Sequence, residues 1–345
     1  MSPDPVTLQI SLAPTDLPTA IHTLPHQLRQ WGEQVDEILL TVDLHRSRGK
    51  FAEDWEERLP GLRRLIDDCC ARYSHARSID VDYDAETRDT VASTFFAGQS
   101  IPLKDYRGAP FYSYLFSLYS AKNNHVFHLD SDMLFGGGSR TWVSEALDVI
   151  NRRSEVLACN PLPGPPTADG ALRSQVLERD QVGPAAFRMS ALSTRIFLID
   201  LDRLPVLKES RVTGRPAWHA RIEGNPTFHA LENAISRSMA SRGLIRVDFL
   251  GVDPGVWSVH PPWRSAAFYE RLPDLIEEIE QGQIPEAQRG CHDVEDCMVD
   301  WTDVRPSTRR TIVSHSRRAF ERFSRSLTTK GQPGSWIARA KNFVT

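Results

Sequence analysis

The sequence predicts an α/β protein with a mostly parallel sheet flanked by helices. Short apolar runs that are typical of strands alternate with longer segments whose apolar residues recur at helical spacing. Such alternation along the whole chain favours a parallel sheet covered by helices. The chain has 345 residues, 40% of them hydrophobic, which is enough for one large α/β domain with an extension, or for two domains.

The N-terminal elements follow this alternation. Residues 6–12 alternate like a strand, and the turn Pro14-Thr15-Asp16 ends it and can cap the next helix. The helix that follows carries an apolar face up to Trp31 and is stopped by Gly32. The next predicted elements are a strand at 37–44, a helix at 59–73 and a strand at 78–83.

The same pattern continues to about residue 263. The predicted elements are a helix at 111–121, a strand at 125–130, a helix at 142–150, strands at 155–159 and 191–200, a helix at 228–242 and a strand at 245–250. Residues 160–167, 208–226 and 255–263 read as loops, and the first two are candidate lids. We therefore expect an α/β domain at 1–263 and a helical extension at 264–345.

Composition excludes several classes of protein. A net charge of −4 and a pI of about 6.3 give no general nucleic-acid footprint, so no nucleic-acid partner is expected. No run of 18 apolar residues predicts a membrane span, and the first twelve residues lack the features of a secretory signal. Five irregularly spaced cysteines argue against a disulfide framework. We expect a cytoplasmic protein.

The strongest functional signal is the run from His125 to Asp132. The apolar strand ends in Asp130 and Asp132, and Gly136-Gly137-Gly138 follows as a turn through which the backbone can approach a ligand. Open α/β sheets bind ligands at the carboxyl ends of their strands. Two carboxylates on one side of a strand end favour a cation between them, and oxygen ligands suit Mg²⁺ or Mn²⁺ that also grips a phosphate. His125 and His128 are unusual for a plain core strand.

Asp-x-Asp is a weak pattern by itself. Asp200-Leu201-Asp202 also follows an apolar run, but it is typical of the start of a helical turn at Asp202-Arg203-Leu204. Asp130 and Asp132 have a structural alternative too, because a pair at a strand end can simply cap the next turn.

Two more residues are candidates for chemistry. Glu232 lies on the margin of an apolar helical stripe, where a half-covered carboxylate suits a general base, although a surface glutamate fits the same position. His260 follows the last predicted strand, and its imidazole is either a ligand for a cation such as Mn²⁺ or a packed loop residue.

Three residues besides Asp130 are candidates for ligand contacts. Asp43 and Asp82 lie at the ends of predicted strands and either accept hydrogen bonds from a base or ribose or cap turns. Arg107 precedes the amino end of a helix and either pairs with phosphate or lies on the surface.

The order of these features over residues 5–263 resembles a GT-A type nucleotide-sugar glycosyltransferase, nearest to the family 2 group. Leu129-Asp130-Ser131-Asp132 is similar to the metal-binding signature of that family, and residues 37–43 resemble its second strand with a donor-binding aspartate. Leu231-Glu232-Asn233 resembles the acidic pair that holds the catalytic base, and Val259-His260-Pro261 is similar to the late metal-binding histidine.

Three departures separate the chain from the family pattern. Asp43-Leu44-His45-Arg46 stands where Asp-Asp-Gly-Ser is common, and Glu232-Asn233 replaces Glu-Asp. No Gln-x-x-Arg-Trp run is present, so the chain does not resemble a processive synthase.

The resemblance implies transfer of a sugar from a nucleotide-diphosphate donor, with a UDP-sugar favoured, to an acceptor hydroxyl of unknown identity. It implies Mn²⁺ or Mg²⁺ on Asp130, Asp132 and His260, and an inverting reaction with Glu232 as base. A retaining transferase, a metal-dependent phosphatase and a non-catalytic nucleotide-sugar binder are the alternatives. Met133-Leu134-Phe135 fits the phosphatase pattern poorly. Trp218 either stacks on an acceptor ring or anchors a hinge.

The C-terminal stretch is strongly basic. From Arg305 to the end it holds ten Lys or Arg residues against one acidic residue, Glu321. An apolar side lies beneath these charges, so the stretch either rests on the anionic inner membrane surface or packs onto its own domain. The second arrangement is the commoner one for such a helix.

Overall fold

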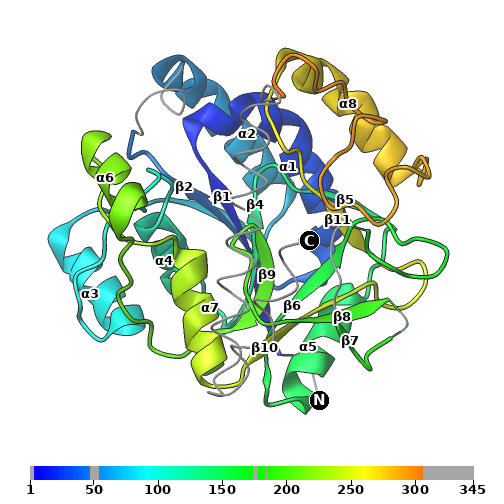
Figure 1. The fold of residues 1–345 in the computed structure, drawn as a ribbon. Coiled ribbons are helices and arrows are strands. Elements are labelled where there is room, and N and C mark those ends of the chain that lie inside the picture. The colour runs from blue at the N-terminus through cyan, green and yellow to red at the C-terminus, as the bar shows by residue number, and fades with distance from the viewer. Residues whose placement is uncertain (1–3, 47–53, 174–177, 184, 306–345) are drawn as a thin grey trace, which may run out of the picture. The chain divides into compact units, whose positions relative to one another are not determined.

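The computed structural model describes residues 4–46, 54–173, 178–183 and 185–305 (Figure 1). Residues up to Asp300 form one compact unit, and a second unit begins at Trp301, of which residues 301–305 are described. The predicted domain boundary at residue 263 stays a prediction. Residues 306–345, with most of the basic stretch and its predicted membrane contact, lie outside the described residues.

A large mixed sheet forms the centre of the first unit. The strand order along its main path is β3-β2-β1-β4-β9-β6-β10-β8-β7. The bounds are β3 (Ala76–Asp80), β2 (Glu37–Val42), β1 (Val6–Leu12), β4 (His125–Asp130), β9 (Ile196–Asp200), β6 (Val156–Pro163), β10 (Ile245–Phe249), β8 (Ala186–Met189) and β7 (Glu178–Arg179). β3, β2, β1 and β4 run parallel, whereas β9 runs antiparallel to both of its neighbours. The predicted α/β class with a mostly parallel sheet is confirmed.

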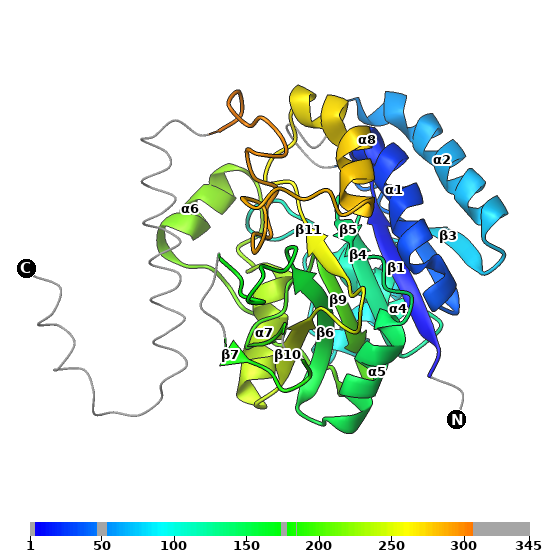
Figure 2. The same cartoon turned by 90° about the vertical axis from the view of Figure 1, so that its right-hand side faces the viewer.

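Helices cover both faces of this sheet (Figures 1 and 2). One apolar cluster packs α1 (Leu17–Trp31), α2 (Trp55–Arg72) and α5 (Trp142–Arg152) on the sheet, and a second packs α3 (Ala85–Phe96), α4 (Tyr112–Tyr119) and α7 (Leu231–Ser241). β1 illustrates how successive side chains of a strand face opposite sides of the sheet. Leu8 and Ile10 belong to the first cluster, while Gln9 between them points to the other face. α8 (Ala266–Glu280) packs against α1.

Two predicted loops contain regular structure. The stretch 208–226 holds α6 (Gly214–Ile222), and 255–263 holds β11 (Trp257–Val259). Both elements are short, and neither has a clear apolar period of its own. β9 also begins at Ile196 rather than at residue 191. The predicted helical turn after Asp200 is confirmed, because a 3₁₀ turn spans Leu201–Arg203.

Two glycines of the run after Asp132 allow close strand packing, and the expectation that the run lets the backbone approach a ligand stays a prediction. Gly136 ends β5 (Leu134–Gly136), which pairs antiparallel with β11. A Cβ on Gly136 would overlap the ring of Trp257, and one on Gly137 would lie 2.5 Å from the carbonyl oxygen of Gly255. Glycine is needed because the two segments lie this close. The pairing carries His260 toward Asp132.

Candidate functional site

The predicted site residues gather at one edge of the sheet. Asp43 and Asp130 lie at the carboxyl ends of β2 and β4, and Asp82 follows β3, the next parallel strand. α7 leads into β10 at the amino edge, so Glu232 in its first turn lies at the carboxyl edge. In open α/β sheets this edge binds ligands.

The loop between α3 and α4 crosses this edge. Lys104 in that loop pairs with Asp43, with Nζ 3.3 Å from Oδ2. Two residues on, the backbone N–H of Tyr106 donates to the carbonyl of Phe228, just before α7. The loop therefore connects the Asp43 side of the edge to the Glu232 side.

Asp132 and His260, both predicted site residues, lie close to one another. His260 Nε2 lies 3.8 Å from Asp132 Oδ2, and its Nδ1 lies 3.8 Å from Asp293 Oδ1. Both Asp132 and His260 are buried. His260 Nδ1 has no hydrogen-bond partner among the described residues.

An arginine already neutralises Asp132. Arg264 Nη2 donates to Asp132 Oδ2 at 3.0 Å, and its Nη1 donates to Asp16 Oδ1 at 2.9 Å. Burial alone would raise the pKa of Asp132, but His260 and Arg264 outweigh it and hold that pKa below its usual value. For Asp16 burial dominates, so its pKa is raised in spite of Arg264.

Asp130 lies against two aromatic residues, the partly buried Tyr114 and the buried His128. The Tyr114 hydroxyl donates to Asp130 Oδ1 at 2.7 Å, and His128 Nε2 lies 3.5 Å from the same oxygen. Burial and then the Asp130 charge raise the pKa of Tyr114 well above its usual value, so its hydroxyl keeps the proton that it donates.

A buried polar chain fixes the His128 ring. The Gln9 amide nitrogen donates to Thr41 Oγ1 at 3.2 Å, which leaves Gln9 Oε1 as the acceptor for His128 Nδ1. The proton of the neutral ring is thereby assigned to Nδ1. The lone pair of Nε2 then faces Asp130, and Nε2 has no hydrogen-bond partner in the described part of the chain. This arrangement explains a histidine in the middle of a core strand.

Asp43 and Asp82 have different surroundings. Asp43 Oδ1 accepts from the Tyr83 hydroxyl at 2.7 Å, and with Lys104 on its other oxygen the carboxylate is fixed in place. Asp82 is a turn residue whose oxygens accept from the Asp84 backbone and from Thr87 Oγ1, before and within α3. These hydrogen bonds lower the pKa of Asp82.

Arg107 and Glu232 lie near one another. Arg107 forms a two-pronged pair with Asp105, with Nε and Nη2 3.1 and 3.0 Å from Oδ2. Burial lowers the pKa of Arg107, but Asp105 and Glu232 raise it overall. The Glu232 side chain is partly exposed.

Sequence reasoning missed four residues that the structure adds to the site. They are Tyr114, Arg195, Arg264 and Asp293. Arg195 stands directly before β9, and its carbonyl accepts from the backbone N–H of Asp130. No sequence signal marked them, because each meets its partner only through the fold.

The donor set suits a divalent cation, although the arrangement belongs to a state in which arginine holds Asp132. Two carboxylates and an imidazole are ligands that Mn²⁺ accepts, and the unpartnered Nε2 of His128 faces Asp130. Across the described ranges, no three His, Cys, Asp or Glu side chains are already placed around one ion position. Cation binding would therefore require Arg264 to move.

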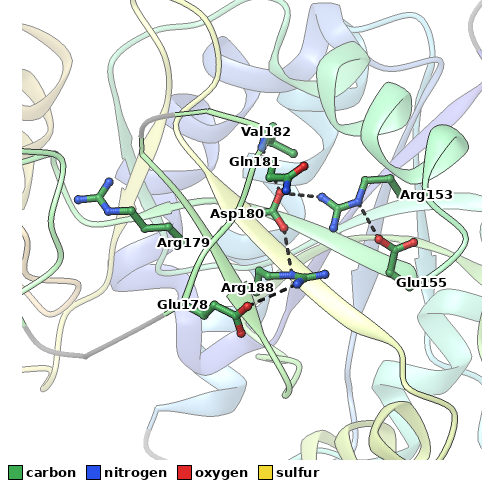
Figure 3. Close-up of a pocket in the computed structure, with 8 residues that line it drawn as sticks. All are labelled: Arg153, Glu155, Glu178, Arg179, Asp180, Gln181, Val182 and Arg188. Atoms are coloured by element: carbon green, nitrogen blue, oxygen red, sulfur yellow. Dashed lines mark hydrogen bonds and ion pairs between the residues drawn. The ribbon is translucent and has the colours of Figure 1, made fainter.

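A separate hollow of about 410 Å³ lies at the amino end of β6, away from Asp130 (Figure 3). Its acidic and basic side chains pair with one another. Arg153 pairs with Glu155 at 2.9 Å and with Asp180 at 2.6 Å, and Arg188 also pairs with Asp180. The network stabilises the β7–β8 edge.

No helix in the described residues is both long and apolar enough to span a bilayer.

No protein-family model matches the sequence, and no curated protein matches it. Three similar solved structures are glycosyltransferases. Glucosyl-3-phosphoglycerate synthase from Mycobacterium tuberculosis, in complex with Mn²⁺, UDP and glucosyl-3-phosphoglycerate, has 10% identity and a TM-score of 0.34, with 80% of this chain and 78% of that chain covered. S. aureus TarS 1–349 in complex with UDP-GlcNAc has 9% identity and a TM-score of 0.36, with 82% and 68% covered. Mouse xyloside xylosyltransferase 1 has 12% identity and a TM-score of 0.32, with 69% and 81% covered. Likeness at these TM-scores transfers no activity, ligand or residue role to this chain.

Proposed function

We propose that this chain is a glycosyltransferase that moves a sugar from a nucleotide-diphosphate donor, a UDP-sugar, to an acceptor hydroxyl. The observation that carries the proposal is the meeting of Asp132 and His260, 3.8 Å apart, with Asp130 ending the strand before them. Carboxylates and imidazole at the carboxyl edge of a parallel sheet suit a site for a cation and a diphosphate.

Asp130, Asp132 and His260 would hold Mn²⁺ or Mg²⁺. When bound, the cation would neutralise the negative charge that develops on the departing diphosphate. Tyr114 orients Asp130 for this role, since its hydroxyl donates to Oδ1. Asp43, fixed by Tyr83 and Lys104, has acceptor capacity left for a hydroxyl or N–H of the nucleoside.

Glu232 would take the proton of the acceptor hydroxyl as the hydroxyl attacks the anomeric carbon, which gives inversion. Its place in the first turn of α7, at the carboxyl edge, supports this role. Arg107, which is paired with Asp105, is a candidate phosphate contact. Asp82 is the weakest donor contact, since both of its oxygens already cap a turn.

The exposed ring of Trp218 supports an acceptor site on α6. Trp218 is 59% exposed, and Ile222, one helical turn further along α6, is 62% exposed. An aromatic ring that is not used for packing can stack on a sugar or another flat apolar face.

The test is release of UDP from a panel of UDP-sugars with Mn²⁺ present, with and without candidate acceptors. We expect one donor to be consumed, and Asp132→Asn to abolish its consumption. A chain that consumes no donor and binds none would refute the proposal. Donor binding without turnover in any condition would indicate a non-catalytic binder instead.

A further inference from the structure

Arg264 is held more firmly than a surface arginine. Its guanidinium spans two carboxylates from different parts of the fold, Asp16 after β1 and Asp132 after β4, at 2.9 and 3.0 Å. Those carboxylates are 16% and 11% exposed, so neither is well solvated. Burial would lower the pKa of Arg264, yet the two carboxylates raise it far above its usual value.

The positive charge of Arg264 neutralises Asp132, as the charge of a bound metal ion would. It donates to Oδ2, the oxygen that faces His260 Nε2. A guanidinium and a divalent cation that contact the same carboxylate repel one another strongly in a poorly solvated site. Both cannot share Asp132 without a loss of affinity for one of them.

We propose that Arg264 is a positioning residue that competes with the divalent cation for Asp132 and so sets the affinity of the site for metal. This inference rests on the proposed function. In the arginine-bound state the two buried carboxylates are neutralised without metal. Cation binding at Asp132 requires the guanidinium to leave Oδ2, and Asp16 then remains as its partner.

The geometry gives Arg264 room to move. Its side chain is about one-third exposed, and it stands in the short segment between β11 and α8 rather than inside either element. Asp16 is the N-cap residue of α1 and its Oδ2 accepts from the backbone N–H of Ala13 at 2.9 Å, so this partner stays fixed. Arg264 can therefore release Asp132 while it keeps Asp16.

The test is titration with Mn²⁺ in the presence of UDP, followed by electron paramagnetic resonance of free Mn²⁺. Arg264→Gln removes the competing charge, and we expect it to bind Mn²⁺ at least about tenfold more tightly than the wild type. Arg264→Lys keeps a charge and should stay within a few-fold of the wild type. Arg271→Gln is the matched control, because Arg271 on α8 is 33% exposed and pairs with Asp274 and Glu278.

The outcomes separate this inference from the proposed function. If Asp132→Asn abolishes Mn²⁺ binding while Arg264→Gln binds no more tightly than wild type, the cation site stands and the competition is refuted. Equal gains in Arg264→Gln and Arg264→Lys, or in Arg271→Gln, also refute it. If no variant binds Mn²⁺, or if Asp132→Asn binds it normally, the cation site and this inference both fail.

Discussion

Asp132→Asn separates the role of Asp132 in ligand binding from its role in stability. The substitution keeps an oxygen acceptor for Arg264 but removes the negative charge. A hydrogen bond to a charged group contributes about 1.5–3 kcal/mol. Arg264 is 34% exposed and retains Asp16 at 2.9 Å, so we expect a loss at the low end, about 1–2 kcal/mol after allowance for solvent screening. That corresponds to a fall in Tm of about 1.5–3 °C.

Asp200→Asn is a closely matched control. Asp200 is 11% exposed, as Asp132 is, and it pairs with a single arginine, Arg203, at 2.9 Å. It belongs to the rival Asp-x-Asp triplet, yet it pairs in register with His125 at the amino end of β4, the opposite edge of the sheet. We expect a similar loss of stability and no effect on ligand binding.

The assay is thermal unfolding with and without Mn²⁺ and UDP. A ligand at about a hundred times its Kd stabilises the folded state by about 2.7 kcal/mol, or roughly 4 °C for a chain of this size. Wild type and Asp200→Asn should show this rise, and Asp132→Asn should show none. The reasoning is refuted if Asp132→Asn rises as much as the wild type, or if Asp200→Asn loses the rise.

Three further variants test other parts of the account. Glu232→Gln should lower kcat by about 10²–10⁴-fold and leave the Mn²⁺/UDP rise in Tm intact, whereas unchanged turnover would exclude Glu232 as base. Glu280 has a pKa of about 2 instead of 4.5, mainly because His26 and Arg29 bind it, so its contribution to stability is present above pH 4.5 and disappears as the pH falls toward 2. Urea unfolding of Glu280→Gln should therefore show a flatter acid limb than wild type; parallel limbs would contradict this. Trp142 is fully buried and its Nε1 donates to the Phe249 carbonyl, so Trp142→Ala should lower the free energy of unfolding by about 3–5 kcal/mol. A loss below about 1 kcal/mol in the same assay would mean that the core packs differently.

Much of the fold could be predicted because its elements carry their own periodicity. β1 and β10 alternate apolar and polar residues, β4 is a mainly apolar run, and α7 shows its apolar stripe in the sequence. β11 could not be predicted, since three residues have no period and its strand conformation depends on pairing with β5.

The candidate site could be predicted only in part. Asp130 and Asp132 were marked by their place after an apolar run, and His128 by its oddity in one. The partners of Asp132 could not be found in this way, because Arg264 lies 132 residues further along the chain. Likewise, the hydrogen bond between Gln9 and His128 depends on the register between β1 and β4.

A crystal structure with Mn²⁺ and UDP bound tests the central claim most directly. The account predicts an anomalous manganese peak bounded by the carboxylates of Asp130 and Asp132, with His260 facing it and Arg264 released from Asp132 Oδ2. A structure that holds UDP while Arg264 stays on Asp132 and no manganese peak lies beside these residues would contradict it.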